Sequence, residues 1–123
     1  ARLITGLKKH DHITPTLKSL HWLPVEKRIL FKTLVITYKV LNDEGPTYLK
    51  DLLTLYSPAR TLRSSSNNLL TVPKTRYVET SKRAFGVRAP AEWNRLPLNI
   101  RSKKTLCSFR SALKTYLFNL AYG

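Results

Sequence analysis

The stretch around which the chain is organised is Leu20-His-Trp-Leu-Pro-Val-Glu-Lys-Arg-Ile-Leu-Phe-Lys-Thr-Leu-Val-Ile-Thr-Tyr-Lys-Val-Leu41. Its apolar residues recur at the spacing of a helix, and they form two flanks. One flank holds Leu30, Phe31, Leu34, Tyr38 and Leu41, and the other holds Val25, Ile29, Ile36 and Val40. A basic stripe of Arg28, Lys32 and Lys39 runs between them. Because apolar flanks are normally covered, we expect a helix over about 24–42 that runs through the middle of the domain.

The residues around this helix indicate where it begins and ends. Pro24 suits the start of a helix, while Asn42-Asp-Glu-Gly-Pro46 is typical of a helix end, with Gly45 suited to a left-handed cap. Thr14-Pro15 indicates an earlier start, with one or two turns before His21, after a basic lead-in over 1–12. A short amphipathic turn is expected near 48–53.

The second half of the chain differs from the first in composition and in its expected secondary structure. A basic Ser/Asn-rich loop begins at Ser57, and short strands are expected over 69–72, 75–80 and 84–88. Residues 89–97, between two prolines, predict a compact helical turn that carries Trp93. The final helix has one apolar stripe, with Thr105 or Ser102 as its cap. This stripe consists of Leu106, Phe109, Leu113, Tyr116, Leu117 and Leu120.

These elements predict a mainly α fold, a small helical domain with a few short strands in its basic middle segment. At 123 residues the chain is long enough for one domain with a core. Within it, we expect a helical scaffold over 1–56 and a basic segment over 57–123 that ends in the amphipathic helix. The chain has no methionine, even at position 1, so we expect it to be a piece of a larger protein.

The charge of the chain indicates its class of partner. There are 22 Lys and Arg residues against 7 Asp and Glu, a formal net charge of +15. Residues 1–59 carry +4 of this charge and residues 60–123 carry +11. Such an excess favours a polyanionic partner, with RNA or DNA first and an anionic membrane surface second.

Other features of the composition limit the location and the cofactors. The single cysteine, Cys107, excludes an internal disulfide and a multi-cysteine zinc site. No signal peptide is visible and no apolar run is long enough to span a bilayer, so we expect an intracellular chain, in the nucleus or cytoplasm, without a membrane partner. His10, His12 and His21 are the weak candidates for a metal site.

Acidic residues give no sign of catalysis. All seven are scattered, and the one adjacent pair, Asp43-Glu44, falls in the predicted helix end. A two-metal centre needs acidic ligands brought together. We therefore predict that this chain alone is not an enzyme, with no catalytic residue, no metal ligand and no cofactor of its own.

The basic side chains are the candidate site, because few acids are interleaved with them to relieve their repulsion. Tyr77 joins them as a candidate for stacking on a base, whereas Trp22 and Trp93, each beside Leu and Pro, are expected to anchor the core. The predicted nucleic-acid-binding residues are Arg28, Lys32, Lys39, Arg60, Arg63, Lys74, Arg76, Tyr77, Lys82, Arg83, Arg88, Arg101, Lys103, Lys104, Arg110 and Lys114.

An ordered series of short motifs extends over about residues 3–120. It comprises Leu-His-Trp-Leu-Pro-Val-x-x-Arg-Ile-x-Phe-Lys (20–32), Tyr-Lys-x-Leu-Asn (38–42), Gly-Pro-x-Tyr-Leu-x-Asp-Leu-Leu (45–53), Leu-Arg-Ser-Ser (62–65), Val-Pro (72–73), Ala-Phe (84–85), Ala-Pro-x-x-Trp-Asn-x-Leu-Pro (89–97) and Phe-Arg-x-x-Leu-Lys-x-Tyr-Leu-Phe (109–118). Together they resemble the C-terminal section of the reverse transcriptase of LINE-type (non-LTR) retrotransposons.

The resemblance implies a role without chemistry of its own. In that family the metal-binding aspartates lie in the palm, in a Phe/Tyr-x-Asp-Asp motif that this chain lacks. The chain would correspond to the thumb and the tail beyond it, which grip the template–primer duplex. Its partners would be RNA or DNA and an upstream palm domain of the same polypeptide, which would bind the divalent metal.

Two other functions stay open at the level of the sequence. One is a structural or protein-interaction domain derived from a transposon fragment, with no intrinsic activity. The other is a peripheral membrane binder that uses the basic-flanked apolar face of the final helix, although that face is more simply explained as core.

Overall fold

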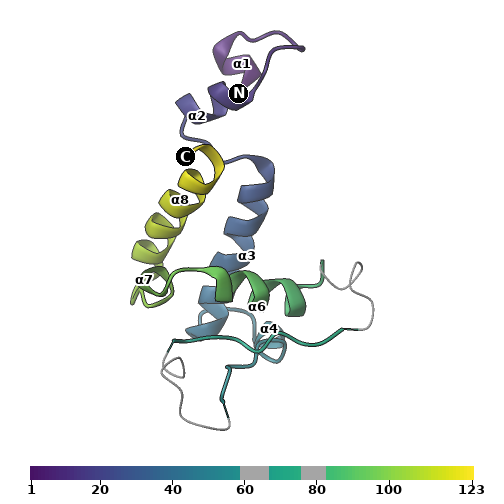
Figure 1. Ribbon diagram of the computed structural model, residues 1–123, viewed down its shortest axis with the longest axis vertical. Helices are drawn as coiled ribbons and strands as arrows, with labels where there is room; N and C mark the ends of the chain where they lie inside the picture. Colours follow the sequence, from purple (N-terminus) through teal and green to yellow (C-terminus); the bar gives the residue numbers. More distant parts are fainter. Residues whose placement is uncertain (59–66, 76–82) are drawn as a thin grey trace.

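The computed structural model describes residues 1–58, 67–75 and 83–123, which form helices joined by turns and loops (Figure 1). Within these residues there are seven helices, which confirms the prediction of a mainly α fold. They are α1 (Arg2–Thr5), α2 (Thr14–Ser19), α3 (Val25–Leu41), α4 (Thr47–Lys50), α6 (Phe85–Arg95), α7 (Leu98–Arg101) and α8 (Leu106–Tyr122).

The core lies where three helices meet. Helices α3 and α8 run antiparallel beside each other, and α6 crosses α3 near its C-terminal half (Figure 1). From α8, Phe109, Leu113 and Leu117 are fully buried in this core, and Leu106 and Tyr116 are partly buried against it. Leu120, the last residue of the predicted apolar stripe, is exposed. The predicted cap is also confirmed, because the Thr105 side chain accepts a hydrogen bond from the Ser108 amide.

Helix α3 begins and ends where the sequence predicts, but the left-handed residue at its end is different. The Glu44 amide donates to the Lys39 carbonyl at 2.8 Å and the Asp43 amide donates to the Val40 carbonyl at 3.3 Å. This is the Schellman arrangement, and Asp43 occupies its left-handed position with φ of 59°. Gly45 is required for close packing instead, because a Cβ there would lie 2.6 Å from Val40 Cγ2.

The second apolar flank of α3 is uncovered. Val25, Ile29 and Ile36 are 71%, 49% and 39% exposed, and within this flank Val40 is buried at the helix end. The expectation that α3 runs through the middle of the domain is therefore wrong for the described part of the chain. The helix lies at one side of the core, because α6 and α8 both pack on its other flank.

The region around Trp93 also differs from the sequence prediction. A strand was expected over 84–88, but α6 begins at Phe85 with Ala84 as its N-cap, and Pro90 lies inside this helix. The residue before a proline disfavours helical geometry, so the sequence indicated a helix boundary there. Burial of Ala89, Pro90 and Trp93 in the core outweighs this preference.

The predicted strand over 69–72 is reduced to one antiparallel bridge, between Leu55 and Leu70. Of the predicted strand over 75–80, only Thr75 lies within the described residues.

The N-terminal segment, residues 1–22, contacts the C-terminal end of α8 (Figure 1). Tyr122 Oη donates to the Trp22 carbonyl at 2.8 Å, and Lys18 Nζ donates to the Tyr122 carbonyl at 3.1 Å. The His21 ring stacks on Phe118 with centroids 5.6 Å apart. These contacts hold the His21-Trp22 dipeptide against the C-terminal half of α8.

Candidate nucleic-acid interface

Two hollows lie along the α3–α8 pair, and both contain predicted binding residues. The first, of about 300 Å³, is lined by Arg28 of α3, by Arg110 and Lys114 of α8, and by four further residues. Those four are His21, Trp22, Leu23 and Phe31. Arg110 and Lys114 are one helical turn apart, so both side chains project on the same side of α8. Among the described residues that line this hollow, three are cationic and none is acidic.

Arg28 is held in place within the first hollow. Its Nε donates to the Leu23 carbonyl at 2.8 Å, and its guanidinium lies over the Trp22 ring, 5.5 Å from the centroid. A cation fixed in this way loses little side-chain entropy when an anion binds. The first hollow therefore contains a preorganised positive charge.

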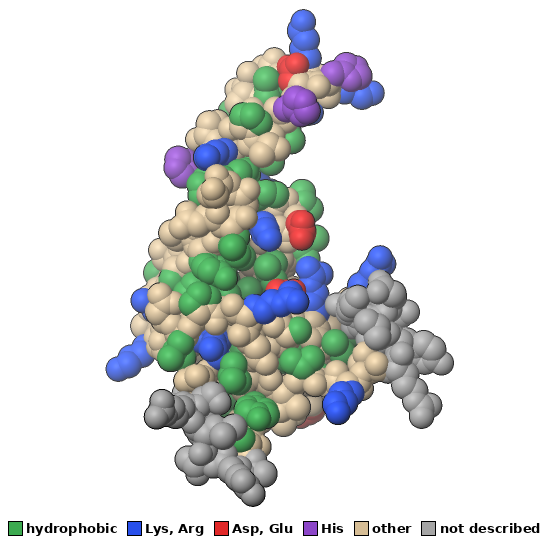
Figure 2. Space-filling view, in the orientation of Figure 1, with side chains coloured by type: hydrophobic (Ala, Val, Ile, Leu, Met, Phe, Trp, Pro, Cys, Tyr) green, Lys and Arg blue, Asp and Glu red, His purple; other side chains and the backbone are tan. Residues whose placement is uncertain are grey.

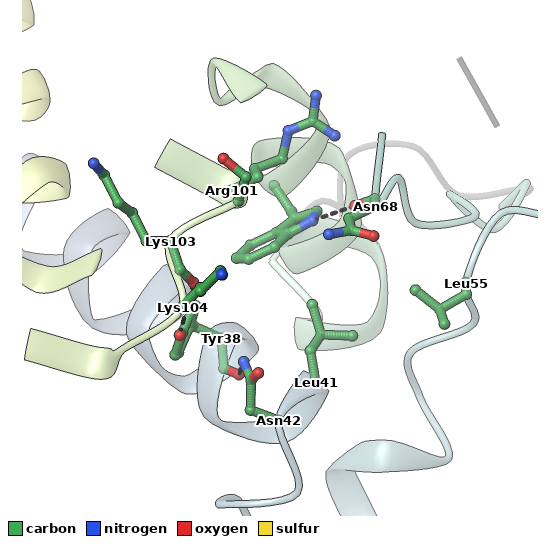
Figure 3. A pocket seen from close by; sticks show the side chains of 10 residues that line it. Tyr38, Leu41, Asn42, Leu55, Asn68, Arg101, Lys103 and Lys104 are labelled. Carbon is green, nitrogen blue, oxygen red and sulfur yellow. Dashed lines mark hydrogen bonds between the residues drawn. The ribbon is translucent and has the colours of Figure 1, made fainter. Parts of the chain in front are cut away.

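The second hollow, of about 430 Å³, lies at the C-terminal end of α3 (Figure 3). Tyr38 of α3 and Asn42, the residue that follows this helix, face the segment that joins α7 to α8, which carries Lys103 and Lys104. Tyr38 Oη donates to the Lys103 carbonyl at 2.9 Å and so fixes this segment on α3. Both lysine side chains are exposed, and Lys103 extends away from the other labelled side chains (Figure 3).

The two hollows follow one another along one side of the α3–α8 pair. Phe31 lines the first and Tyr38 the second, and residues seven apart project from the same face of a helix. Two turns of helix separate them by about 10 Å. We call the five cations along this side the cationic seam; they are Arg28, Lys103, Lys104, Arg110 and Lys114.

The other side of the helix pair has a different charge pattern. There, Lys27 and Tyr116 line a hollow together with Glu92 and Arg95 of α6, which form an ion pair at 2.9 Å. On the face where α6 crosses α3, Lys and Arg side chains are spread over the whole length with few Asp and Glu between them (Figure 2). The hollow on this side therefore contains an acidic residue, Glu92, whereas the described lining of the two seam hollows contains none.

The remaining predicted residues lie in other places. Lys32 is exposed and Lys39 half-buried on α3 beside the seam, so the predicted stripe is present on one helix edge. Lys74 and Arg83 are exposed and Arg88 is half-buried, and these three line neither hollow. The predicted residues Arg60, Arg63, Arg76, Tyr77 and Lys82 lie outside the described residues.

Arg101 has a structural role in place of the predicted surface role. The residue is buried, its Nε donates to the Leu96 carbonyl at 3.0 Å, and another of its nitrogens donates to the Asn67 carbonyl. Burial lowers the pKa of its guanidinium below the ordinary value. Because these donors are used inside the protein, we leave Arg101 out of the seam although it lines the second hollow.

The two tryptophans have different environments, although the sequence predicted core positions for both. Trp93 is 2% exposed and donates from Nε1 to the Asn68 carbonyl at 2.8 Å, which confirms its core position. Trp22 is 36% exposed at the first hollow, so the prediction is wrong for this residue. Its partner Arg28 is six residues away, with Pro24 between them, and no local sequence pattern indicates that pairing.

Residues 1–58, 67–75 and 83–123 hold no group of three or more His, Cys, Asp or Glu side chains placed to bind a metal. None of the helices in the described part of the chain is both long and apolar enough to cross a bilayer. Comparison of the chain with known proteins finds no matching family model, no matching curated protein and no matching solved structure.

Proposed function

We propose that this chain binds nucleic acid through the sugar–phosphate backbone, along the cationic seam. The observation that carries the proposal is the alignment of the two hollows on one side of α3 and α8, with cations and no acids among their described lining residues. Without a polyanion, the mutual repulsion of these side chains would be relieved only by salt. A phosphate backbone supplies the missing counter-charge at regular intervals.

The wider context that we propose is the thumb and tail of a LINE-type reverse transcriptase. The ordered motif series supports it, and so does a packed helix pair with one cationic side. In that context, this chain would position RNA or DNA during RNA-templated DNA synthesis. The chemistry and the divalent metal would belong to an upstream palm domain, and phosphate contacts would carry little sequence information.

The test is oligonucleotide affinity as a function of salt, measured with a matched pair of charge variants. Replacing Arg28, Arg110 and Lys114 together with Gln should weaken binding for all sequences. About four or five neutralised phosphates would give the unmodified chain a log–log salt slope of about −3 to −5, and the triple variant a slope nearer zero by about two.

The control carries the same loss of charge at positions outside the seam, namely Lys8, Lys9 and Lys27 replaced with Gln. This control should lose less affinity than the seam variant and keep most of the slope. Equal losses in the two variants would mean that net charge, and not the seam, governs binding. A flat salt dependence of the unmodified chain would contradict backbone binding altogether.

One observation favours the alternative function, a protein-interaction domain derived from a transposon fragment. The Val25, Ile29 and Ile36 flank of α3 is exposed, which is unusual for a run of apolar side chains on one helix. The alternative predicts no affinity for RNA or DNA even at low salt. The same titration therefore distinguishes the two functions.

A further inference from the structure

Within residues 1–58, 67–75 and 83–123, Trp22 is the one large aromatic side chain that borders the cationic seam and remains open to solvent. It is 36% exposed, whereas the other seam-side aromatics have less access, since Tyr38 is 3% exposed and Phe31 is partly buried against the core. Exposing an indole to water forgoes a large gain from burial. Its position therefore needs a reason other than core packing.

The backbone around Trp22 is fixed in a sparsely populated conformation. His21 has φ of 54°, in the left-handed region that a residue with a side chain seldom adopts. It ends α2 in a Schellman arrangement, in which the Trp22 amide donates to the Leu17 carbonyl at 2.9 Å. The Trp22 carbonyl accepts from Tyr122, so both polar backbone groups of Trp22 are used.

The indole is also positioned by its neighbours. The Arg28 guanidinium lies over the ring, and the Leu23 carbonyl in turn holds Arg28. The indole is therefore an ordered platform next to Arg28, Arg110 and Lys114. A planar group and a fixed set of cations side by side match the two parts of a nucleotide, its base and its phosphate.

We propose that Trp22 stacks on one unpaired base of a strand whose phosphates lie on Arg28, Arg110 and Lys114. The site therefore takes single-stranded nucleic acid, or a single-stranded segment beside a duplex, in preference to continuous duplex. In a duplex the faces of internal bases are covered by their neighbours, so the indole has no base face to contact. This inference rests on the proposed function, because the seam must first hold the backbone.

The experiment uses the full chain and three probes: an oligothymidylate of about ten nucleotides, an abasic strand of the same length, and a long duplex. The abasic strand keeps the phosphates and sugars and lacks only the bases. The expected result is that the oligothymidylate binds about 5- to 150-fold more tightly than the abasic strand. It should also quench tryptophan emission, which the abasic strand should leave unchanged. The duplex should bind more weakly than the oligothymidylate, per site.

Two variants separate stacking from positioning. Trp22→Leu should remove most of the advantage of the oligothymidylate over the abasic strand. Affinity for the abasic strand should fall much less, since that strand loses only the contribution of the contact between the indole and Arg28. Trp22→Phe, which keeps an aromatic ring, should retain most of that advantage. Because Trp93 is buried, its emission serves as an internal reference for an intact core.

The inference would be overturned if the unmodified chain bound the oligothymidylate and the abasic strand equally well. It would also be overturned if Trp22→Leu weakened both probes to the same degree, since Trp22 would then act only by holding Arg28. Failure of the proposed function is a different result, in which the unmodified chain binds none of the three probes.

Discussion

At the scale of single residues, two helices end on a residue other than glycine in the left-handed conformation. His21 ends α2 and Asp43 ends α3, with φ of 54° and 59°. The sequence favoured Gly45 for the second position, because glycine adopts this conformation without steric cost. The hydrogen bonds from the Asp43 amide to Val40 and from the Glu44 amide to Lys39 determine which residue is left-handed. In this arrangement it is the residue directly after the C-cap Asn42, which is Asp43.

This geometry predicts that Asp43→Gly stabilises the protein. Removing the side chain from the left-handed position should raise the free energy of unfolding by about 0.5–1 kcal/mol. The ion pair that Asp43 forms with Lys50 is exposed and contributes little. Urea denaturation gives the measurement, with Gly45→Ala as a control that should destabilise by crowding Val40. A lower midpoint for Asp43→Gly would show that the side chain of Asp43 supports the turn.

At the scale of elements, the sequence predicted the two long helices well and placed the short helices α2 and α4 close to where they lie. Helices α3 and α8 each span 17 residues, enough for an apolar period to stand out. The first turn of α6, over 85–88, was missed, because Pro90 disfavours a helix just before it and tertiary burial overrides this local preference. The exposed flank of α3 was missed for the opposite reason, since no local pattern says which apolar flank a partner helix covers.

The hydrogen bond from Tyr38 Oη to the Lys103 carbonyl joins α3 to the segment before α8. The environment of Tyr38 also predicts how the stability of the protein depends on pH. Burial first, and the charge of Glu44 second, raise the pKa of Tyr38 above its ordinary value of 10.0. Below that value the phenol is neutral in both the folded and the unfolded chain. Above it the unfolded chain ionises first, so stability falls as the pH rises through the raised pKa.

Tyr38→Phe should therefore lower the free energy of unfolding by about 1 kcal/mol near neutral pH, through loss of the hydrogen bond to Lys103. It should also make the decline above about pH 10 shallower than in the unmodified chain. Urea denaturation at about pH 8 and about pH 11 measures both effects. A parallel decline in the two proteins would mean that Tyr38 titrates alike in the folded and unfolded states.

At the scale of the whole molecule, the charge was predictable and its arrangement was not. The sequence indicated a polyanion from a net charge of +15, and the predicted binding residues include all the Lys and Arg side chains that line the two hollows. It did not show that Arg28 of α3 faces Arg110 and Lys114 of α8, because that pairing depends on how two distant helices pack. Nor did the sequence show that Arg101 is buried and hydrogen-bonded inside the protein, whereas Lys103, two residues later, is exposed.

The most direct test of the cationic seam is a map of backbone amide shifts in solution, with and without an unstructured oligonucleotide at low salt. The seam predicts changes gathered at Arg28, at Arg110 and Lys114, and over 103–104, with small changes at Lys8, Lys9 and Lys27. Changes spread in proportion to exposed charge, or centred on the exposed Ile29 and Ile36 flank, would contradict it.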